Sequence, residues 1–203
     1  MNLTDKGGDF EQPPVGTHVA RSIGLIDIGS QHGEYQGQKT FKRQFILRWE
    51  LPGELMTKGE FEGKPFVVSK FYTASLSEKS NLRKDLVNWR GREFTSDELA
   101  GFAAKNILDK GCMVQITAKG DKHRVTGVMA LPKGTKAPEA ANAIEYFSLE
   151  KGEFDPVVFG RFSEKMQAMI ANSPEYKAAV GIESAIDDSY SPDFTEVDDP
   201  IPF

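Results

Sequence analysis

Apolar and polar residues alternate with a period of two over much of the first 130 positions, which is the pattern of half-buried β-strands. Residues 40–51 are the clearest case. On one parity lie Phe41, Phe45, Leu47, Trp49 and Leu51, and on the other lie Lys42, Gln44, Arg48 and Glu50. We therefore expect the first set to point into a core and the second set to point outward.

Two further strands are expected on either side of this one in the chain. Residues 18–30 are rich in β-branched side chains, but their apolar phase slips beside Gly24, which indicates a bulge or a strong bend. A loop is expected at 31–38, where glycines interrupt the pattern. A Gly-rich connection at 52–63 then leads to a third strand at 65–73.

Helical spacing replaces this alternation after the third strand. Ser75 and Glu78 have the spacing of a capping box, and the helix that they begin is expected to end at Gly91. Its apolar positions are Leu82, Leu86 and Trp89. Thr95 and Glu98 form a second capping box and predict a further short helix.

Two more strands are predicted at 112–118 and 123–131, joined by a turn at Gly120-Asp121. Three strands, a helical insertion and two strands is the element order of the oligonucleotide/oligosaccharide-binding (OB) fold, a five-stranded Greek-key barrel. The sequence therefore predicts a mainly β protein with an OB-type barrel over residues 17–132. A flexible leader is expected at residues 1–16.

The pattern changes again after the barrel. Residues 133–180 are expected to form a linker followed by an amphipathic helix that begins at Asp155-Pro156. The apolar stripe of this helix consists of Phe159, Phe162, Met166, Met169 and Ile170. The stripe could dock another protein, but packing against the barrel is favoured. Residues 181–203 are expected to be a disordered acidic tail.

Composition limits the class of protein. With 203 residues, 39% of them hydrophobic, and a mean hydropathy of −0.42, the chain suits one packed domain with extensions. It has no run of roughly 20 apolar residues that could span a membrane, and its polar N-terminus lacks the features of a secretory signal. The single cysteine, Cys112, cannot form an internal disulfide, so we expect a cytoplasmic protein.

Charge is divided unevenly along the chain, although the net charge is only −5. Residues 17–136 contain 20 Lys or Arg and 13 Asp or Glu, whereas residues 183–203 contain seven acids and no base. This division is expected of a protein whose body binds a polyanion and whose tail binds something else, although it is also common in proteins that do neither.

Catalytic and metal-binding patterns are poor. The three histidines are scattered, and Cys112 has no second Cys or His at zinc spacing. Lys133-Gly134-Thr135 has the wrong order for a phosphate-binding loop. The sequence therefore predicts no enzyme, no cofactor and no metal site.

Cations and aromatic rings instead occur together where an OB barrel binds its ligands. Single-strand binders place cations along phosphates and stack bases on rings, and strands two and three with their flanking loops form the ligand face. The candidate DNA-binding residues are Tyr35, Lys39, Lys42, Arg48, Lys70, Phe71, Tyr72, Lys119, Lys122 and Arg124. Trp49 is expected in the core.

The last six residues end the acidic run in a compact apolar tip, Asp198-Asp199-Pro200-Ile201-Pro202-Phe203. This tip resembles that of bacterial single-stranded DNA-binding proteins, which recruits DNA-processing enzymes. Asp198 and Asp199 match its acidic part, and Ile201, Pro202 and Phe203 match its apolar part, while Pro200 replaces an acid. The alternative is a solvated tail that only favours solubility.

Body and tail together resemble a bacteriophage-encoded single-stranded DNA-binding protein, and the stretch from Phe71-Tyr72 to Trp89-Arg90-Gly91 is similar to a phage family. The resemblance implies largely sequence-independent binding of single-stranded DNA during DNA replication, recombination or repair in the bacterial cytoplasm. It also implies that host or phage replication and repair enzymes bind the tip. Self-association stays open. The alternative is an OB-fold adaptor of a replisome or recombination complex that does not itself bind DNA.

Overall fold

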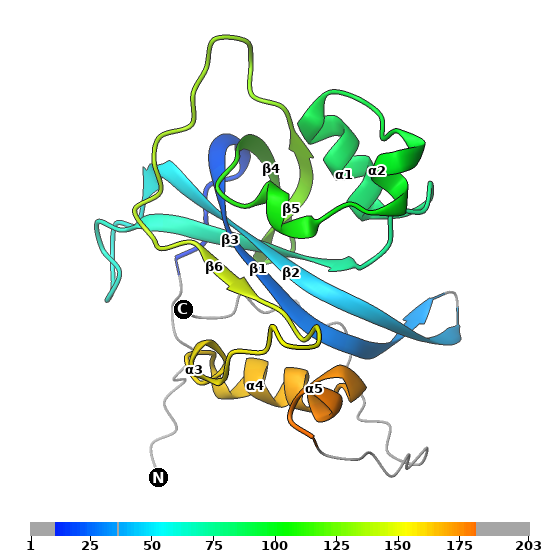
Figure 1. Ribbon diagram of the computed structural model, residues 1–203. Coiled ribbons are helices and arrows are strands. Elements are labelled where there is room, and N and C mark those ends of the chain that lie inside the picture. Colours follow the sequence, from blue (N-terminus) through cyan, green and yellow to red (C-terminus); the bar gives the residue numbers. More distant parts are fainter. Residues whose placement is uncertain (1–10, 36, 182–203) are drawn as a thin grey trace, which may run out of the picture.

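The computed structural model describes residues 11–35 and 37–181 of the chain, and the side chain of Tyr35 falls outside this description (Figure 1). The architecture is mainly β. Five strands, β1 (Gly16–Tyr35), β2 (Gln38–Leu55), β3 (Pro65–Thr73), β4 (Gly111–Lys119) and β5 (Lys122–Met129), form an antiparallel sheet in the order β3-β2-β1-β4-β5. A short strand, β6 (Glu145–Phe147), pairs in parallel with Gly24–Ile26 of β1. Among the described residues β3 and β5 do not pair, so the sheet is open.

A helical insertion separates β3 from β4, as the sequence predicted, but it has three pieces where two helices were expected. The three pieces are α1 (Asn81–Arg90), α2 (Ser96–Ala100) and a turn of 3-10 helix, η1 (Ala104–Ile107). The capping box of Thr95 and Glu98 at α2 is confirmed. The box expected at Ser75 is wrong, because Ser80 caps α1 by accepting from the backbone N–H of Arg83, whereas the Ser75 hydroxyl accepts from the backbone N–H of Ser77.

The loop expected at 31–38 is also wrong. β1 continues to Tyr35 and β2 begins at Gln38, so the two strands form a long hairpin arm (Figure 1). Gly33 does not end the strand, since it pairs with Thr40 within the ladder. Gly37, with φ of 75°, lies in the turn, where a left-handed conformation suits glycine.

Both faces of the central strands are buried, which explains the apolar phase slip in β1. The register of β1 against β2 shifts between Ser22 and Gly24, as the bulge prediction required, and again between Asp27 and Gly29. Leu25 packs into the main core, whereas Ile26 and Ile28 pack into a second cluster on the outer face. The main core includes Trp49, as predicted, together with Leu47, Leu51, Leu86, Cys112 and Val114.

The second cluster is covered by residues 141–181, here called the C-terminal cover. The amphipathic helix expected from Asp155 to about Asn172 is divided into α3 (Pro156–Phe159) and α4 (Glu164–Ala171), because Gly160 ends α3 and the Ser163 hydroxyl caps α4. The short helical piece expected at 175–180 is α5 (Pro174–Ala179), which the Ser173 hydroxyl caps. The three helices lie beside the sheet (Figure 1). Their apolar side chains form one cluster with Ile26, Ile28 and Ile46. The stripe therefore packs on the sheet.

Hydrogen bonds to carboxylates hold this cover in place. Buried Asp27 accepts from the backbone N–H of Leu149, at 3.2 Å, and from Arg43. Fully buried Glu50 accepts from the backbone N–H groups of Ala141 and Asn142, each at 2.8 Å. The parity of β2 that the sequence assigned to solvent is thus largely covered, and Phe41, which was assigned to the core, is 52% exposed on the hairpin arm.

Candidate functional site

A groove of about 830 Å³ runs along the edge strand β3. Eight consecutive residues, Lys64 to Phe71, line it, so the groove follows both side-chain faces and the edge of this strand. His123, Arg124 and Val125 of β5 also line it. The groove therefore occupies the gap between the two edges of the open sheet.

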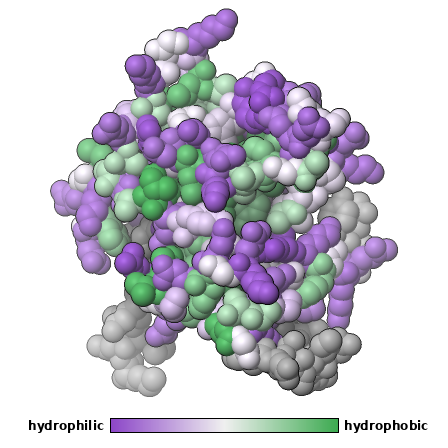
Figure 2. Space-filling model, viewed as in Figure 1, coloured by the Kyte–Doolittle hydropathy of each residue, from purple (hydrophilic) through white to green (hydrophobic). Residues whose placement is uncertain are grey.

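Residues far apart in the chain form the remaining walls. Residues 142–146, from β6 and the segment before it, contribute one wall, and Val158 and Arg161 extend this wall from the helical part of the C-terminal cover. The face that carries β6 shows apolar side chains bordered by hydrophilic ones (Figure 2). Phe61, in the connection between β2 and β3, lies at another part of the rim.

The leader segment bridges two sides of the groove. The Glu11 carboxylate accepts from the backbone N–H of Thr57 at 2.7 Å. This hydrogen bond is the main cause that lowers the pKa of Glu11. Next to it, the Gln12 side-chain oxygen accepts from the backbone N–H of His123 at 3.2 Å, and the Pro13 carbonyl accepts from the His123 ring at 2.6 Å. Residues 11–13 thus join the β2–β3 connection to β5, although they were expected to belong to a flexible leader.

The lining is cationic. Five Lys or Arg side chains face two carboxylates, so the formal charge of the lining is positive. The cations are Arg48, Lys64, Lys70, Arg124 and Arg161, and the carboxylates are Glu11 and Glu145. A concave surface of one sign concentrates oppositely charged ligands, so a polyanion is the ligand class that the groove favours.

Exposed aromatic rings accompany these cations. Phe71 is 36% exposed and Tyr146 is 37% exposed, and both line the groove. The Lys64 Nζ lies 5.2 Å from the centre of the Phe61 ring at the rim. Rings that are open on one side offer the stacking surface that unpaired bases need.

Arg48 lines the groove but is not the open cation that the alternation in β2 predicted. Its side chain passes over Gly24, where a Cβ would lie only 3.1 Å from the Arg48 Cβ and Cδ. The guanidinium donates to the Glu145 carboxylate at 2.6 Å, and the two side chains are 17% and 25% exposed. Burial lowers the pKa of Arg48, and the nearby Glu145 charge partly opposes this shift.

Tyr72 is a core residue, and the prediction that it binds DNA is therefore corrected. It is only 2% exposed. The Asp85 carboxylate on α1 accepts from the Tyr72 hydroxyl at 2.6 Å and from the Lys70 Nζ at 2.7 Å. Burial, and then the Asp85 charge, raise the pKa of Tyr72 far above its usual value. Lys70 lines the groove while paired to Asp85, so it too is less open than the sequence suggested.

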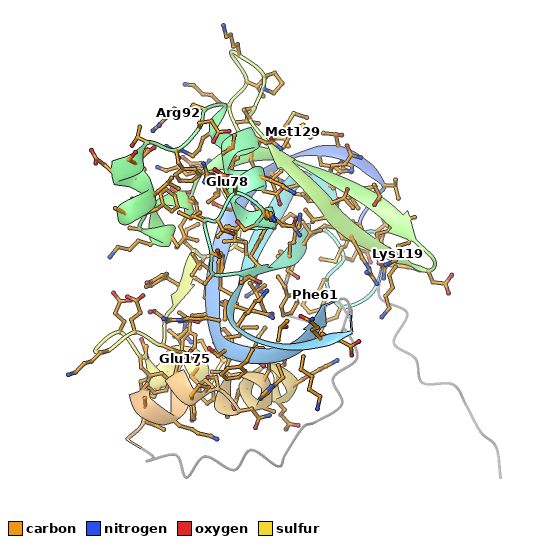
Figure 3. The ribbon with its side chains drawn as sticks, turned by 90° about the vertical axis from the view of Figure 1, so that its right-hand side faces the viewer. Phe61, Glu78, Arg92, Lys119, Met129 and Glu175 are labelled. Atoms are coloured by element: carbon orange, nitrogen blue, oxygen red, sulfur yellow. The ribbon has the colours of Figure 1, made fainter. Side chains whose placement is uncertain are left out.

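The other candidates divide into two locations. Lys39 and Lys42 are exposed on the hairpin arm and do not line the groove, and Tyr35 ends β1 on the same arm. Lys119 and Lys122 flank the turn between β4 and β5, directly before His123 of the groove; Figure 3 shows Lys119 at the tip of this hairpin. Of the ten predicted residues, Arg48, Lys70, Phe71 and Arg124 therefore meet in one groove.

Phe61, Tyr146 and Arg161 were not found from the sequence. Phe61 is the nearest to a detectable signal, because an aromatic residue with Lys64 close behind it precedes a strand of the ligand face. Tyr146 lies in a three-residue strand within a segment that was expected to be a linker. Arg161 reaches the site only because the C-terminal cover folds back over the sheet.

No cluster of three or more potential metal ligands occurs among residues 11–35 and 37–181. In the same residues no helix is long and apolar enough to cross a membrane. Cys112 is buried, which raises the pKa of its thiol and disfavours a reactive thiolate. The tip residues Asp198, Asp199, Ile201, Pro202 and Phe203 lie outside the described residues.

Comparison with protein-family models, with curated proteins and with solved structures finds no match for this chain. The chemistry of the groove is therefore the basis on which a function can be assigned.

Proposed function

We propose that this protein binds single-stranded DNA through a partly open OB-type barrel. The strand order β3-β2-β1-β4-β5, with helices between β3 and β4, is that of the OB fold before its last two edges meet. Cα atoms of β3 and β5 lie within 8 Å of each other, and partly open barrels belong to this fold. These features support the fold assignment.

One observation carries the functional proposal: the groove between β3 and β5 combines an excess of cations with exposed rings. Phosphates would lie along Lys64, Arg124 and Arg161, and bases would stack on Phe71 and Tyr146. Stacking uses the π-face that every base has, and it is worth about 1–3 kcal/mol per base. Binding is therefore largely independent of sequence and requires unpaired bases.

The tail gives the proposal its biological setting. A phage-encoded protein of this kind would coat DNA during replication, recombination or repair in the host cytoplasm. Its C-terminal residues Asp198, Asp199, Ile201, Pro202 and Phe203 would recruit host or phage enzymes, since an acidic segment with an apolar end can dock in a basic, apolar pocket.

A titration of fluorescent oligo-dT, followed by anisotropy at two salt concentrations, tests the proposal. Affinity should fall as salt rises, with a slope of about −0.7 for each phosphate that the protein neutralises. Charge reversal of both groove cations Lys64 and Arg124 should weaken binding at least about tenfold. Reversal of two exposed lysines that do not line the groove, Lys133 and Lys136, changes the net charge equally and should not weaken binding to this extent. Binding that ignores salt, or that prefers duplex DNA, contradicts the proposal.

A second candidate, an OB-fold adaptor that binds another protein, has one observation in its favour. Two of the five groove cations, Arg48 and Lys70, already contact the carboxylates of Glu145 and Asp85. If the adaptor proposal is right, oligo-dT should bind neither the unchanged protein nor the variants with reversed charges in the groove.

A further inference from the structure

Glu145 is unexpected in a groove that favours polyanions. Its carboxylate lines the groove and faces the guanidinium of Arg48, with Oε2 2.6 Å from Nη1. A carboxylate in this position repels a phosphate, and it also pairs with the cation that would otherwise bind the phosphate. Its presence therefore needs a reason.

The backbone fixes this contact from both sides. Glu145 pairs with Gly24 in the parallel β1–β6 ladder, and Gly24 pairs with Arg48 in the β1–β2 ladder. Because Gly24 has no side chain, the Arg48 side chain can lie across β1 and reach β6. The pair is thus built into three adjacent strands, and rotation of the Glu145 side chain is enough to separate it.

We propose that the Glu145 carboxylate binds Arg48 at the place where a DNA phosphate would bind. The carboxylate and the phosphate then compete for one guanidinium, and the Arg48–Glu145 pair sets the affinity of the groove for DNA. This inference rests on the proposed function. Arg48 is largely buried and needs an anionic partner, and either group supplies one. When a phosphate takes Arg48, the Glu145 carboxylate turns into the solvent of the groove, where it is already partly exposed.

The competition has a distinctive salt dependence. A neutral Arg48–Glu145 pair releases no additional counterion when DNA binds, whereas an unopposed Arg48 neutralises one more phosphate. Replacing Glu145 by Gln should therefore tighten oligo-dT binding about tenfold at low salt. It should also make the slope of log affinity against log salt steeper by about 0.7.

Glu153→Gln is the matched control. Glu153 belongs to the same C-terminal cover and accepts from the Tyr146 hydroxyl at 2.8 Å. The Gln side chain keeps an oxygen that can accept from this hydroxyl, so the substitution removes the charge, by the same amount as Glu145→Gln, and leaves Tyr146 held in place. Glu153 does not line the groove. Glu153→Gln should therefore shift the affinity less than about threefold, because exposed charges that touch no ligand are screened by salt.

A purely structural role for the pair makes a different prediction. In that case Glu145→Gln lowers the melting temperature but leaves the salt slope equal to that of Glu153→Gln, and this result would overturn the inference. The double variant Arg48→Gln with Glu145→Gln covers the case in which the single variant does not fold. If the two groups compete, the double variant should have the same salt slope as the unchanged protein. A double variant whose slope is shallower by about 0.7 would show that Arg48 already binds a phosphate unopposed in the unchanged protein.

The proposed function and this inference fail in distinguishable ways. If the unchanged protein and every variant ignore oligo-dT, the proposed function is wrong. If the unchanged protein binds oligo-dT with the expected salt dependence while Glu145→Gln behaves like Glu153→Gln, only the competition is wrong.

Discussion

Phe71 and Tyr72 are adjacent on β3, yet their environments are opposite. Phe71 lines the groove with 36% of its surface exposed, whereas Tyr72 is buried and donates to Asp85 of α1. The alternation of a strand separates such neighbours onto two faces. Alternation alone could not tell which face was buried, since Phe66, Val67 and Val68 form an unbroken apolar run.

This difference predicts a separation of binding from stability. Phe71→Ala should weaken oligo-dT binding by about 1–3 kcal/mol through the loss of a stacking surface, with little change in the free energy of unfolding. Tyr72→Phe should lower that free energy by about 1 kcal/mol, because Asp85 loses a hydrogen bond, and should leave oligo-dT affinity unchanged. Anisotropy titration and urea unfolding measure the two effects. Equal losses of affinity in both variants would contradict the assigned environments.

At the scale of elements, the capping box of α2 joins a network at the end of α1. Glu98 accepts from the backbone N–H of Thr95 at 3.0 Å and from Arg92 at 2.7 Å, and it also pairs with Arg90. The hydrogen bond from Arg92, followed by that from Thr95, lowers the pKa of Glu98 from its ordinary value to about 2. The sequence predicted the box, but the two arginines join it only through the fold.

The lowered pKa predicts a pH dependence of stability. A depressed pKa in the folded state means that Glu98 stabilises the fold above about pH 4.5 and that this contribution disappears as the pH falls toward about 2. Glu98→Gln keeps much of the capping geometry but removes the charge. Its melting temperature should therefore lie below that of the unchanged protein at pH 7, and the difference should shrink between about pH 4.5 and 2. A difference that stays constant over this range would exclude a role for the charge.

The C-terminal cover shows why the outer face of β2 was misassigned. Ile46 and Glu50 have the parity of a solvent face, yet they are buried by residues about a hundred positions later in the chain. Local alternation contains no information about a second layer. The phase slip in β1 was the one local sign of it, since Ile26 and Ile28 faced away from the main core.

Because this cover is packed on the sheet, it should unfold with the sheet. Ile170→Ala, at a fully buried position of α4, should lower the free energy of unfolding by about 2–5 kcal/mol. Trp49 and Trp89 lie in the other cluster and report it by fluorescence during a urea titration. Val157→Ala, at a 64% exposed position, is the control and should change stability by less than about 0.5 kcal/mol. An unchanged tryptophan transition in Ile170→Ala would mean that the cover unfolds independently.

At the scale of the whole molecule, the groove exists because the sheet does not close. The mainly β architecture and the order of its elements along the chain were predicted from the alternation and the helical spacing in the sequence. The groove was not predicted from the sequence, because its walls come from β3, β5, the leader and the C-terminal cover. These segments meet only in three dimensions, so neither Tyr146 nor Arg161 could be assigned to the site beforehand.

The division of charge along the chain leads to a last prediction. Residues 183–203 contain seven acids and no base, whereas the groove is cationic. A tethered polyanion competes with DNA for such a groove. Deleting residues 198–203 should therefore leave oligo-dT affinity unchanged or raise it, and any gain should shrink as salt rises, because the Debye length falls below about 10 Å above 0.1 M. Phe203→Ala keeps the acids and should leave oligo-dT affinity unchanged, while it weakens binding of partner enzymes. A marked loss of oligo-dT affinity in the deletion variant would mean that the tip belongs to the DNA-binding surface itself.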